Sequence, residues 1–502
     1  MVIIRDIVTD FSEYEDIELC NDDTEGTEPG CITFSNPSSF FVNVDYSAGK
    51  DIDYSSSHLS TEVDNELCLG TVVRYGASNH DNIDTYILDR VFWSFKPCID
   101  GFGFCKPILQ VDGTFFTGKY NGTLLIASSQ DGNRRIFPIA FAIVEGETKE
   151  AWEWFFFNIR SFVTQQANIC IISDRGTGLL GALRTELPQW CNAYSVFCIR
   201  HVASNFNKEF YDTELKEKVI QMGYELMRPR FERMLDAVRE KNSRAGAWLD
   251  NIPKDKWTQC YDEGRRYGHM TTNLAECINS VLKGCRALPI TTIVTATYHQ
   301  LNSWFIHHRT EAENMIRAGH IYCEELSKVM NENNRKTSCH VVRNFSRGSG
   351  VSEVEVPGTG GRRHNKVYTV RLMESWCDCG EFQSLRLPCS HAVATCASLN
   401  LDTAQFISPI YRLTNILKVY GVEFQPVPNE EYWPIYTGPT FIPNPVMRRN
   451  RKGRPKTKRI HNEMDESQSQ PYKKCGLCRT PGHNRKNCPN TNIQLGESSR
   501  QM

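Results

Sequence analysis

The order of the segments between Lys106 and His201 constrains the fold of this chain more than any other feature. Three apolar, strand-like runs come first, and the short turns between them indicate an antiparallel meander. A helical segment with aromatic residues at helical spacing follows, and then a fourth apolar strand, a second helix and a fifth strand. The predicted segments are 108–111, 122–127, 136–144, 148–163, 168–174, 178–187 and 194–199. Such an order predicts an α/β domain.

Two of these strands end on an aspartate. Asp112 follows the first strand and Asp174 ends the fourth. An ionised carboxylate is costly to bury, so an aspartate at the end of an apolar strand usually points into a cleft or binds a metal. The order β-β-β-α-β-α-β is that of the ribonuclease-H-like fold, in which strands one and four are neighbours. We therefore expect Asp112 and Asp174 at adjacent strand ends, where α/β sheets place their ligands. Two unrelated turns, each begun by an Asp, are the alternative.

An all-helical segment follows the fifth strand. Residues 202–265 contain no convincing strand, and the helical pattern within them is expected to break near Pro229. This segment reads as an insertion into the α/β domain.

The next predicted helix, from Thr272 to about Gly284, carries a candidate third carboxylate, Glu276. Apolar residues flank Glu276, although Asp262 and Glu263 are competing candidates. Phosphoryl transfer between nucleic-acid strands uses two divalent ions about 4 Å apart that bridge the attacking and leaving oxygens. Mg²⁺ prefers oxygen ligands and keeps several waters, so three carboxylates are sufficient for such a site.

Two cysteine–histidine clusters have the spacing of structural zinc sites. The first is Cys377, Cys379, Cys389 and His391, with a strand expected at 366–372 before it and a helix from about Ala392 to Ser398 after it. The second is Cys475, Cys478, His483 and Cys488, which has the spacing of a zinc knuckle and lies among basic residues. Zinc knuckles bind single-stranded nucleic acid or, in some cases, proteins.

Charge is distributed unevenly along the chain. Residues 1–66 contain sixteen acidic residues and only Arg5 and Lys50 as cations, a net charge of −14. Near the other end, a basic run reads as a nuclear-import signal or a phosphate-binding segment, and its Gly-Arg-Pro core resembles an AT-hook. A solvated basic linker is the alternative. The nucleic-acid-binding candidates are Arg448, Arg449, Arg451, Lys452, Arg454, Lys456, Lys458 and Arg459.

The remaining composition indicates an intracellular protein. No run reaches the about 18 apolar residues that a membrane helix needs. The start, Met-Val-Ile-Ile-Arg-Asp, does not have the pattern of a signal peptide. We therefore expect no membrane contact, twenty cysteines in a reducing compartment, and, from the basic run, a nuclear location.

Taken together, these motifs resemble the plant Mutator-like element (MULE) transposases over roughly residues 85 to 490. The motifs that carry the resemblance are Gln110–Phe115, Phe137–Glu145, Ile172–Gly176, Cys198-x2-His201, Asn273–Glu276 and the first cysteine cluster, which is the family's SWIM finger. The resemblance implies a ribonuclease-H-like DDE domain with a helical insertion. It also implies a triad of Asp112, Asp174 and Glu276 that uses Mg²⁺ or Mn²⁺, and zinc at two structural sites. Cys198 and His201 match an extra element of the family, for which a metal and a local structural contact both remain open.

Two departures from the family pattern affect the functional prediction. The first 85 residues hold no zinc-ligand set of the kind that often binds DNA in the family, and Cys277 stands where a serine commonly follows the glutamate. Two functions are therefore carried forward. One is a DDE transposase that binds DNA and, if active, works as a homo-oligomer. The other is a catalytically silent nuclear regulator, similar to the domesticated far-red-response proteins. RNA binding through the knuckle alone is a weaker third possibility.

The sequence predicts the following organisation. An acidic, largely disordered region (1–84) precedes the ribonuclease-H-like core (85–201), the helical insertion (202–265) and the helices that complete the core (266–330). A β-rich segment with the SWIM finger (335–400), a Pro-rich linker (425–446), the basic segment (447–460), the zinc knuckle (472–490) and a disordered tail (491–502) follow.

Overall fold

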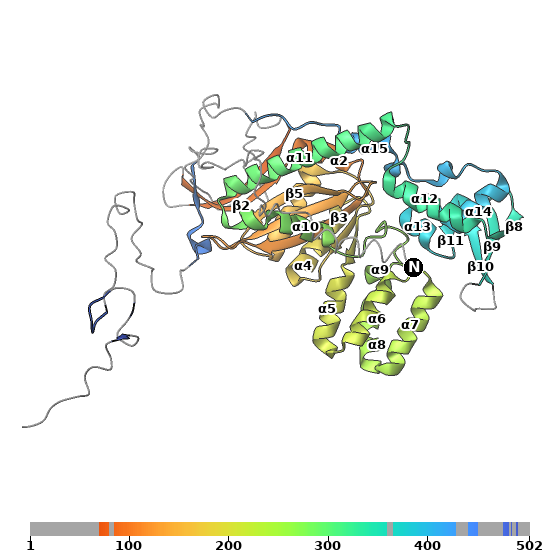
Figure 1. The fold of residues 1–502 in the computed structure, drawn as a ribbon, viewed down its shortest axis with the longest axis horizontal. Helices are drawn as coiled ribbons and strands as arrows, with labels where there is room; N and C mark the ends of the chain where they lie inside the picture. The colour runs from red at the N-terminus through yellow and green to blue at the C-terminus, as the bar shows by residue number, and fades with distance from the viewer. Residues whose placement is uncertain are drawn as a thin grey trace, which may run out of the picture. The chain divides into compact units, whose positions relative to one another are not determined.

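An eight-stranded mixed sheet is the centre of the first of two units into which the chain divides, residues 1–449 and 450–502 (Figure 1). The computed structural model describes residues 70–79, 85–358, 365–427, 440–449, 475–480, 483 and 488–489. The strands of the sheet are β1 (Val72–Asn79), β2 (Thr85–Ser94), β3 (Ile108–Phe115), β4 (Thr123–Gln130), β5 (Ile136–Val144), β6 (Cys170–Ser173), β7 (Tyr194–Phe197) and β12 (Thr440–Pro443). Seven of them follow the order β1-β2-β5-β4-β3-β6-β7, and β12 pairs with β2.

Five of these strands have the order that the sequence predicts for a ribonuclease-H-like domain. β3, β4 and β5 form an antiparallel meander, and β6 and β7 then continue the sheet in parallel beyond β3. The first and fourth core strands, β3 and β6, are therefore neighbours, as predicted. The fold class is confirmed.

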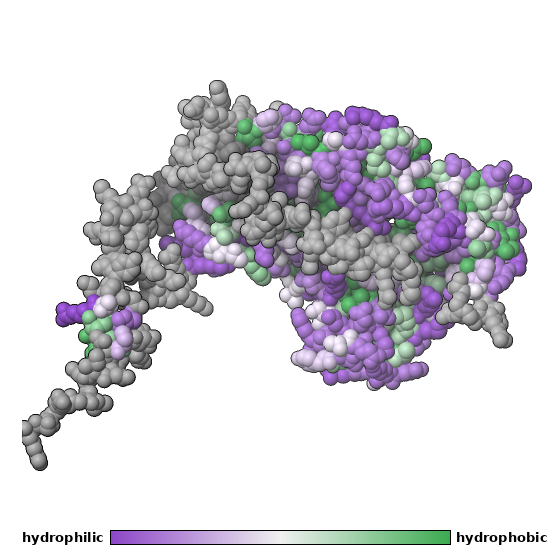
Figure 2. All heavy atoms as spheres, in the orientation of Figure 1, coloured by the Kyte–Doolittle hydropathy of each residue, from purple (hydrophilic) through white to green (hydrophobic). Residues whose placement is uncertain are grey.

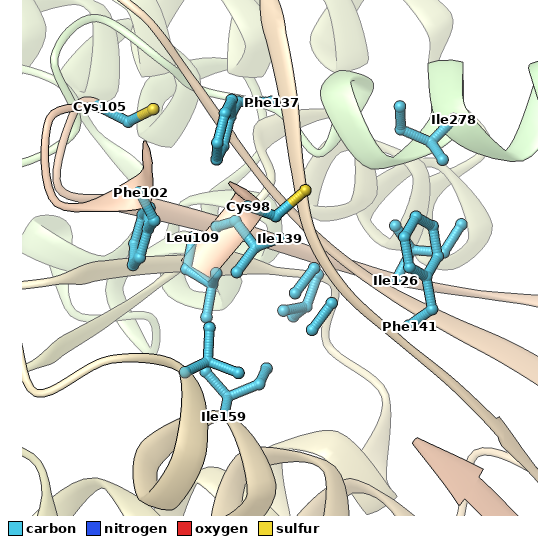
Figure 3. Close-up of a cluster of buried hydrophobic side chains, with 14 of the residues drawn as sticks. Cys98, Phe102, Cys105, Leu109, Ile126, Phe137, Ile139, Phe141, Ile159 and Ile278 are labelled. Atoms are coloured by element: carbon cyan, nitrogen blue, oxygen red, sulfur yellow. The ribbon is translucent and has the colours of Figure 1, made fainter. Parts of the chain in front are cut away.

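Helices cover both faces of the sheet. On one side lie α3 (Lys149–Asn158), its π-helical continuation η3 (Ile159–Val163) and α4 (Thr177–Glu186), and on the other lie α10 (Asn273–Val281) and the long α11 (Ile290–Arg317). Figure 3 shows Ile278 of α10 beside Ile126 and Phe141, whereas Ile159 lies beside Leu109. All five side chains are buried, and α2 (Lys96–Phe102) adds Cys98 and Phe102 to the same core.

One row of paired residues crosses the sheet and ends at Asp112. Trp93 pairs with Phe141, Phe141 with Ile126, and Ile126 with Asp112. Directly paired residues on neighbouring strands point to the same face, so Asp112 shares the α10 face with three buried apolar side chains. Stacking of the Trp93 and Phe141 rings, with centroids 5.3 Å apart, stabilises this row.

The predicted helical insertion is present and has a core of its own. It consists of α5 (Ile199–Phe210), α6 (Thr213–Tyr224), α7 (Arg228–Lys241), α8 (Ser243–Asp250) and α9 (Lys254–Trp257). Pro229 lies in the first turn of α7, so the predicted break is confirmed. Buried Phe206, Phe231 and Trp257 belong to this second core, and the outer surface of the insertion is mainly hydrophilic in Figure 2.

A four-stranded antiparallel sheet, in the order β11-β10-β9-β8, forms the cysteine-rich module. Its strands are β8 (Val341–Ser346), β9 (Val351–Val356), β10 (Lys366–Arg371) and β11 (Trp376–Cys377). The helices α12 (Glu324–Thr337), α13 (Glu381–Leu385) and α14 (Ser390–Leu399) flank it, and α15 (Leu413–Val419) returns to the main core. Hydrogen bonding of Gln259 with Ser384, at 2.6 Å, joins the module to the end of the helical insertion.

The structure corrects the predicted end of the first strand. Asp112 is paired within β3, which continues to Phe115, so no turn begins at Asp112. Pairing of β3 with β6 nevertheless stops at Gln110, two residues earlier. Asp112 therefore pairs with a residue of β4 but lies beyond the last residue pair between β3 and β6, because β4 is longer than β6.

Two predicted boundaries also change. Strand β1 lies within the region 1–84 that was predicted to be largely disordered, yet it is the edge strand of the main sheet. Strand β12 lies within the predicted Pro-rich linker 425–446 and pairs in parallel with β2. Residues 1–69, which make up most of the predicted acidic region, lie outside the described residues. No helix in the described part of the chain is both long and apolar enough to cross a membrane.

Candidate active site and metal centres

Three carboxylates come from three different elements of the core. Asp112 lies on β3, Asp174 directly follows β6, and Glu276 lies on α10. Because β3 and β6 are parallel neighbours, Asp112 and Asp174 both lie just beyond the last pair of that ladder, Gln110 with Ile172. The Gly176 N–H donates to the Asp174 carboxylate at 2.9 Å, which turns the chain into α4.

Helix α10 is bound to β3 by side chains on the same face of the strand. The buried Gln110 carboxamide accepts a hydrogen bond of 2.9 Å from the Leu274 N–H, in the first turn of α10. One turn beyond Glu276, the Asn279 amide donates to Asp112 at 2.7 Å. The Thr272 hydroxyl donates to Glu276 at 2.9 Å. These contacts place Glu276 beside the strand that carries Asp112.

Burial and like charge raise the pKa of Asp112 to about 7. Removal from water is the larger cause, and the negative charges of Glu276 and Glu147 add to it, while His201 acts in the opposite direction. Carboxylates that oppose one another's ionisation are stabilised by a cation, and oxygen donors suit Mg²⁺ or Mn²⁺. The donor set therefore fits divalent ions.

The carboxylates are not arranged as a cage for one ion. Among the described residues, no three of their ligand oxygens all lie within 4.8 Å of one another. A two-ion site distributes its ligands over two centres about 4 Å apart, so a more open arrangement suits it better than it suits one fully enclosed ion.

Glu147 is a fourth carboxylate beside this site that the sequence analysis missed. A Cβ placed on Gly113, the residue after Asp112, would lie 2.8 Å from the Glu147 carboxyl group. Burial and the charge of Asp174 raise the pKa of Glu147. Strand direction could have revealed it: β5 runs parallel to β3, so the residues after Val144 lie at the same edge of the sheet as Asp112.

The neighbouring Glu145 has a different role. It pairs with the Arg90 guanidinium through two hydrogen bonds, one of 2.8 Å and one of 2.5 Å. A bidentate pair neutralises the Glu145 carboxylate and fixes the end of β5 to β2. No hydrogen bond or ion pair in the described part of the chain holds the Glu147 carboxylate in this way.

Cys198 and His201 lie at the start of α5 and face the carboxylates. The Cys198 N–H donates to the Ser173 carbonyl at 2.8 Å, which connects α5 to the end of β6. Hydrogen bonding with Cys198, together with the charges of Asp174 and Glu276, raises the pKa of His201 to about 9. Burial is the largest influence on the Cys198 thiol and raises its pKa, but hydrogen bonds with His201 and Thr272 and the charge of His201 together outweigh burial and leave that pKa below its usual value. The pair therefore has a local structural contact and places a cation beside the carboxylates.

The first cysteine cluster is assembled around His391. The ligand atoms of Cys377, Cys379, Cys389 and His391 all lie within 4.8 Å of one another. The His391 Nδ1 is 3.7 Å from the sulfur atoms of both Cys377 and Cys389. Tetrahedral zinc with ordinary Zn–S and Zn–N bonds requires an S–N separation of about 3.6 Å, so the four side chains fit one zinc ion. The Tyr368 ring stacks on His391 at 4.2 Å and orients it.

The second unit contains the second cluster. The ligand atoms of Cys475, Cys478, His483 and Cys488 also lie within 4.8 Å of one another, and the Cys478 sulfur is 3.1 Å from the His483 Nε2. Two Cys3His clusters are therefore present, and both suit structural zinc.

A third group of possible ligands, His307, His308 and Glu311 on α11, has a different explanation. Arg135 donates two hydrogen bonds, of 2.7 and 2.9 Å, to the Glu311 carboxylate. That carboxylate is already neutralised, so the group is explained by packing of α11 against the β4–β5 turn.

The predicted nucleic-acid-binding run is divided between described and undescribed residues. Arg448 and Arg449 are the last described residues of the first unit, and Arg449 donates to Asn121 at 2.6 Å and to the Phe116 carbonyl. The other six, Arg451, Lys452, Arg454, Lys456, Lys458 and Arg459, lie outside the described residues. Arg448 forms a β-bridge with Tyr120, so both Arg448 and Arg449 are held by the first unit, while DNA binding by the run stays a prediction.

The fold and the two cysteine–histidine clusters define a ribonuclease-H-like protein with accessory modules of the zinc-binding type. Residues 108–205 match the MULE transposase domain, and residues 368–400 match the SWIM zinc finger. The chain therefore contains a MULE transposase domain, which includes Asp112, Asp174, Cys198 and His201, and a SWIM zinc finger, which includes the first cluster. A MULE transposase domain implies DNA binding in general terms. A comparison with curated proteins found no match.

Proposed function

We propose that this protein is a DDE transposase that cuts DNA by water attack and joins the freed 3′-hydroxyl to target DNA. The strongest support is that one ribonuclease-H-like domain brings three carboxylates to the same region. They are Asp112 on β3, Asp174 after β6 and Glu276 on α10. Each carboxylate comes from a different element, so their proximity depends on the folding of the whole domain.

In this proposal Asp112, Asp174 and Glu276 hold two Mg²⁺ or Mn²⁺ ions. When bound, the ions would activate the attacking oxygen and stabilise the leaving oxygen at the phosphate. Asn279 holds Asp112 in position relative to Glu276. The cationic side chain of His201 lies near Asp174 and Glu276 and offsets part of their negative charge before ions bind.

Cleavage by single-residue variants tests the proposal. The protein is incubated with Mn²⁺ and a plasmid that carries the DNA flanking the gene on both sides. Cleavage is expected for the wild type and for Glu217→Gln, which changes an exposed glutamate of α6. We expect a loss of at least about 1,000-fold in Asp112→Asn and Glu276→Gln, since removal of one member of a catalytic set has effects of this size. Cleavage that survives in Asp112→Asn, or is absent in the wild type, contradicts the proposal.

A nuclear regulator without catalysis is the second candidate function. The uneven charge distribution favours it, because an acidic segment at residues 1–66 and a basic run at 448–459 are both suited to partner and DNA contacts. In this case Asp112→Asn would leave transcriptional activity unchanged in a reporter assay. Both candidates act in the nucleus, and the transposase would act as a homo-oligomer. Single-stranded nucleic acid remains a proposed ligand of the second zinc cluster.

A further inference from the structure

The loop between β3 and β4, residues 116–121, is held on both sides by distant parts of the chain. On one side, the Thr117 N–H donates to the carbonyl of Arg286 at 3.2 Å, in the 3-10 helix η5 (Leu282–Ala287). On the other side, the Asn121 N–H donates to the Met447 carbonyl at 2.6 Å. The loop is therefore fixed between η5 and the segment that begins the basic run.

Close packing shows that η5 directly contacts this loop. A Cβ on Gly118 would lie 2.6 Å from the backbone oxygen of Ala287, so only glycine permits this approach. On the opposite side, Tyr120 forms a β-bridge with Arg448, and the Arg449 N–H donates to the Lys119 carbonyl at 3.0 Å. These backbone contacts hold together three segments: the loop 116–121, η5 and residues 447–449.

This arrangement gathers five cations into what we call the loop patch. It consists of Lys119, Lys283, Arg286, Arg448 and Arg449. In the described part of the chain, none of the five cations pairs with a carboxylate. By contrast, two other cations near the main sheet do pair with carboxylates: Arg90 with Glu145, and Lys96 with Asp100. The loop patch therefore carries uncompensated positive charge.

Arg286 connects the loop patch to the carboxylate site. Its guanidinium donates to the Thr114 hydroxyl at 2.5 Å. Thr114 is two residues from Asp112 on the same face of β3, a separation of about 7 Å. Phosphates rise about 3.4 Å per nucleotide along one DNA strand, so Arg286 lies within about two nucleotides of a phosphate held at Asp112.

The geometry points to the loop patch as the surface that grips DNA next to the carboxylate site, with the anchored start of the basic run as one side of the grip. This inference rests on the proposed function for its orientation, since the DNA strand would run from Arg286 towards Asp112. It assigns Arg448 and Arg449, the first two residues of the basic run, a place beside the active site. The partner is duplex DNA, and its phosphates are the groups that the cations contact.

Salt-titrated binding tests the inference separately from catalysis. The full-length protein with Asp112→Asn, which cannot cleave under the proposed function, binds a fluorescent duplex of mixed sequence without added divalent ions. In this background, Lys119→Ala, Lys283→Ala and Arg448→Ala are combined. The slope of log K against log salt is expected to decrease in magnitude by up to about 2.7, because each lost phosphate contact removes about 0.9.

A matched control removes the same charges elsewhere. Lys208, Arg233 and Lys418 are exposed on α5, α7 and α15, and their combined change to alanine is expected to leave the slope unchanged within error. Equal slopes for the patch and control variants overturn the inference, whether or not the wild type cleaves DNA. Absence of cleavage with a patch-dependent slope overturns the proposed function alone.

A variant that keeps every charge provides a second test. Gly118→Ala places a methyl group against the Ala287 carbonyl and so separates the loop from η5. DNA affinity is expected to decrease in this variant while the helical content by circular dichroism is retained. An unchanged affinity shows that the arrangement of the loop patch is unimportant and contradicts the inference.

Discussion

The Asn279 amide donates a hydrogen bond of 2.7 Å to Asp112, and this contact joins helix α10 to strand β3. Asn279 is one helical turn from Glu276, so a single helix both carries one carboxylate and positions another. A side chain that holds a metal ligand in place usually affects metal affinity or activity by 10- to 100-fold, by the general rule for such residues.

We therefore predict that Asn279→Ala weakens Mn²⁺ binding by about 10- to 100-fold, with a loss of about 1–2 kcal/mol in the free energy of unfolding. Isothermal titration with Mn²⁺ and urea unfolding measure the two effects. Ser280→Ala is the control, because Ser280 is exposed on the same helix and bonds only to the Glu276 carbonyl. Unchanged Mn²⁺ affinity in Asn279→Ala would show that Asn279 does not position Asp112.

The raised pKa of Asp112, about 7, predicts how ion binding depends on pH. Between about pH 4 and pH 7 the folded protein keeps a proton that the unfolded chain has lost, so the contribution of Asp112 to stability decreases as pH rises through this window. Divalent ions need the ionised carboxylate, so Mn²⁺ affinity is expected to rise as pH rises towards and through about 7, with release of a proton.

Glu276→Gln separates the two causes of this pKa. Removal of the Glu276 charge lowers the pKa of Asp112 but leaves its burial unchanged. The midpoint of proton uptake by Asp112, followed by carboxyl NMR shifts of the ion-free protein, is therefore expected below that of the wild type. A midpoint that stays at the same pH in Glu276→Gln would mean that Glu276 is too distant to interact with Asp112.

Zinc content provides a prediction for the two cysteine clusters. The chain is expected to bind two zinc ions, and Cys389→Ser to retain about one, because the remaining three ligands leave the tetrahedral site open. Cys396→Ser is the matched control, since Cys396 is equally buried in the same module but is not part of the cluster. Mass spectrometry under native conditions counts the ions. Two zinc ions in Cys389→Ser would refute the assignment.

The order of the core strands could be read from the sequence because it depends on local patterns. Apolar runs separated by short turns produce the meander of β3, β4 and β5, and the helices that follow require parallel crossovers to β6 and β7. The neighbouring positions of Asp112 and Asp174 follow from that order alone. Both zinc clusters were also visible, because ligand spacing in a short segment determines them.

Other features depend on contacts between distant segments and left no local pattern. Asn279 reaches Asp112 only because Gln110 holds the first turn of α10 against β3. Strand β12 is short, and its partner, β2, lies near the other end of the described chain. The end of the first strand was misplaced for the same reason, since β3 is extended by its pairing with β4.

Two glycines beside Glu147 are predicted to respond differently to the same substitution. A Cβ on Gly178 would lie 2.4 Å from the backbone oxygen of Glu147, whereas a Cβ on Gly113 would meet only its flexible carboxyl group. Backbone atoms cannot move aside as easily as the end of a side chain. Gly178→Ala is therefore expected to lower the free energy of unfolding by about 1–3 kcal/mol, despite the better helix propensity of alanine. Gly113→Ala is expected to cost less than about 1 kcal/mol.

Gly146→Ala is the control in this series, because nothing lies within 4 Å of a Cβ at that position. Urea unfolding of the three variants is expected to rank the losses in the order Gly178, Gly113 and Gly146. Gly113→Ala should also displace the Glu147 carboxyl group and so reduce its repulsion of Asp112. The pKa of Asp112 is then expected to decrease in Gly113→Ala but not in Gly146→Ala. If Gly178→Ala is as stable as the wild type, the Glu147 backbone does not pack against α4 as described.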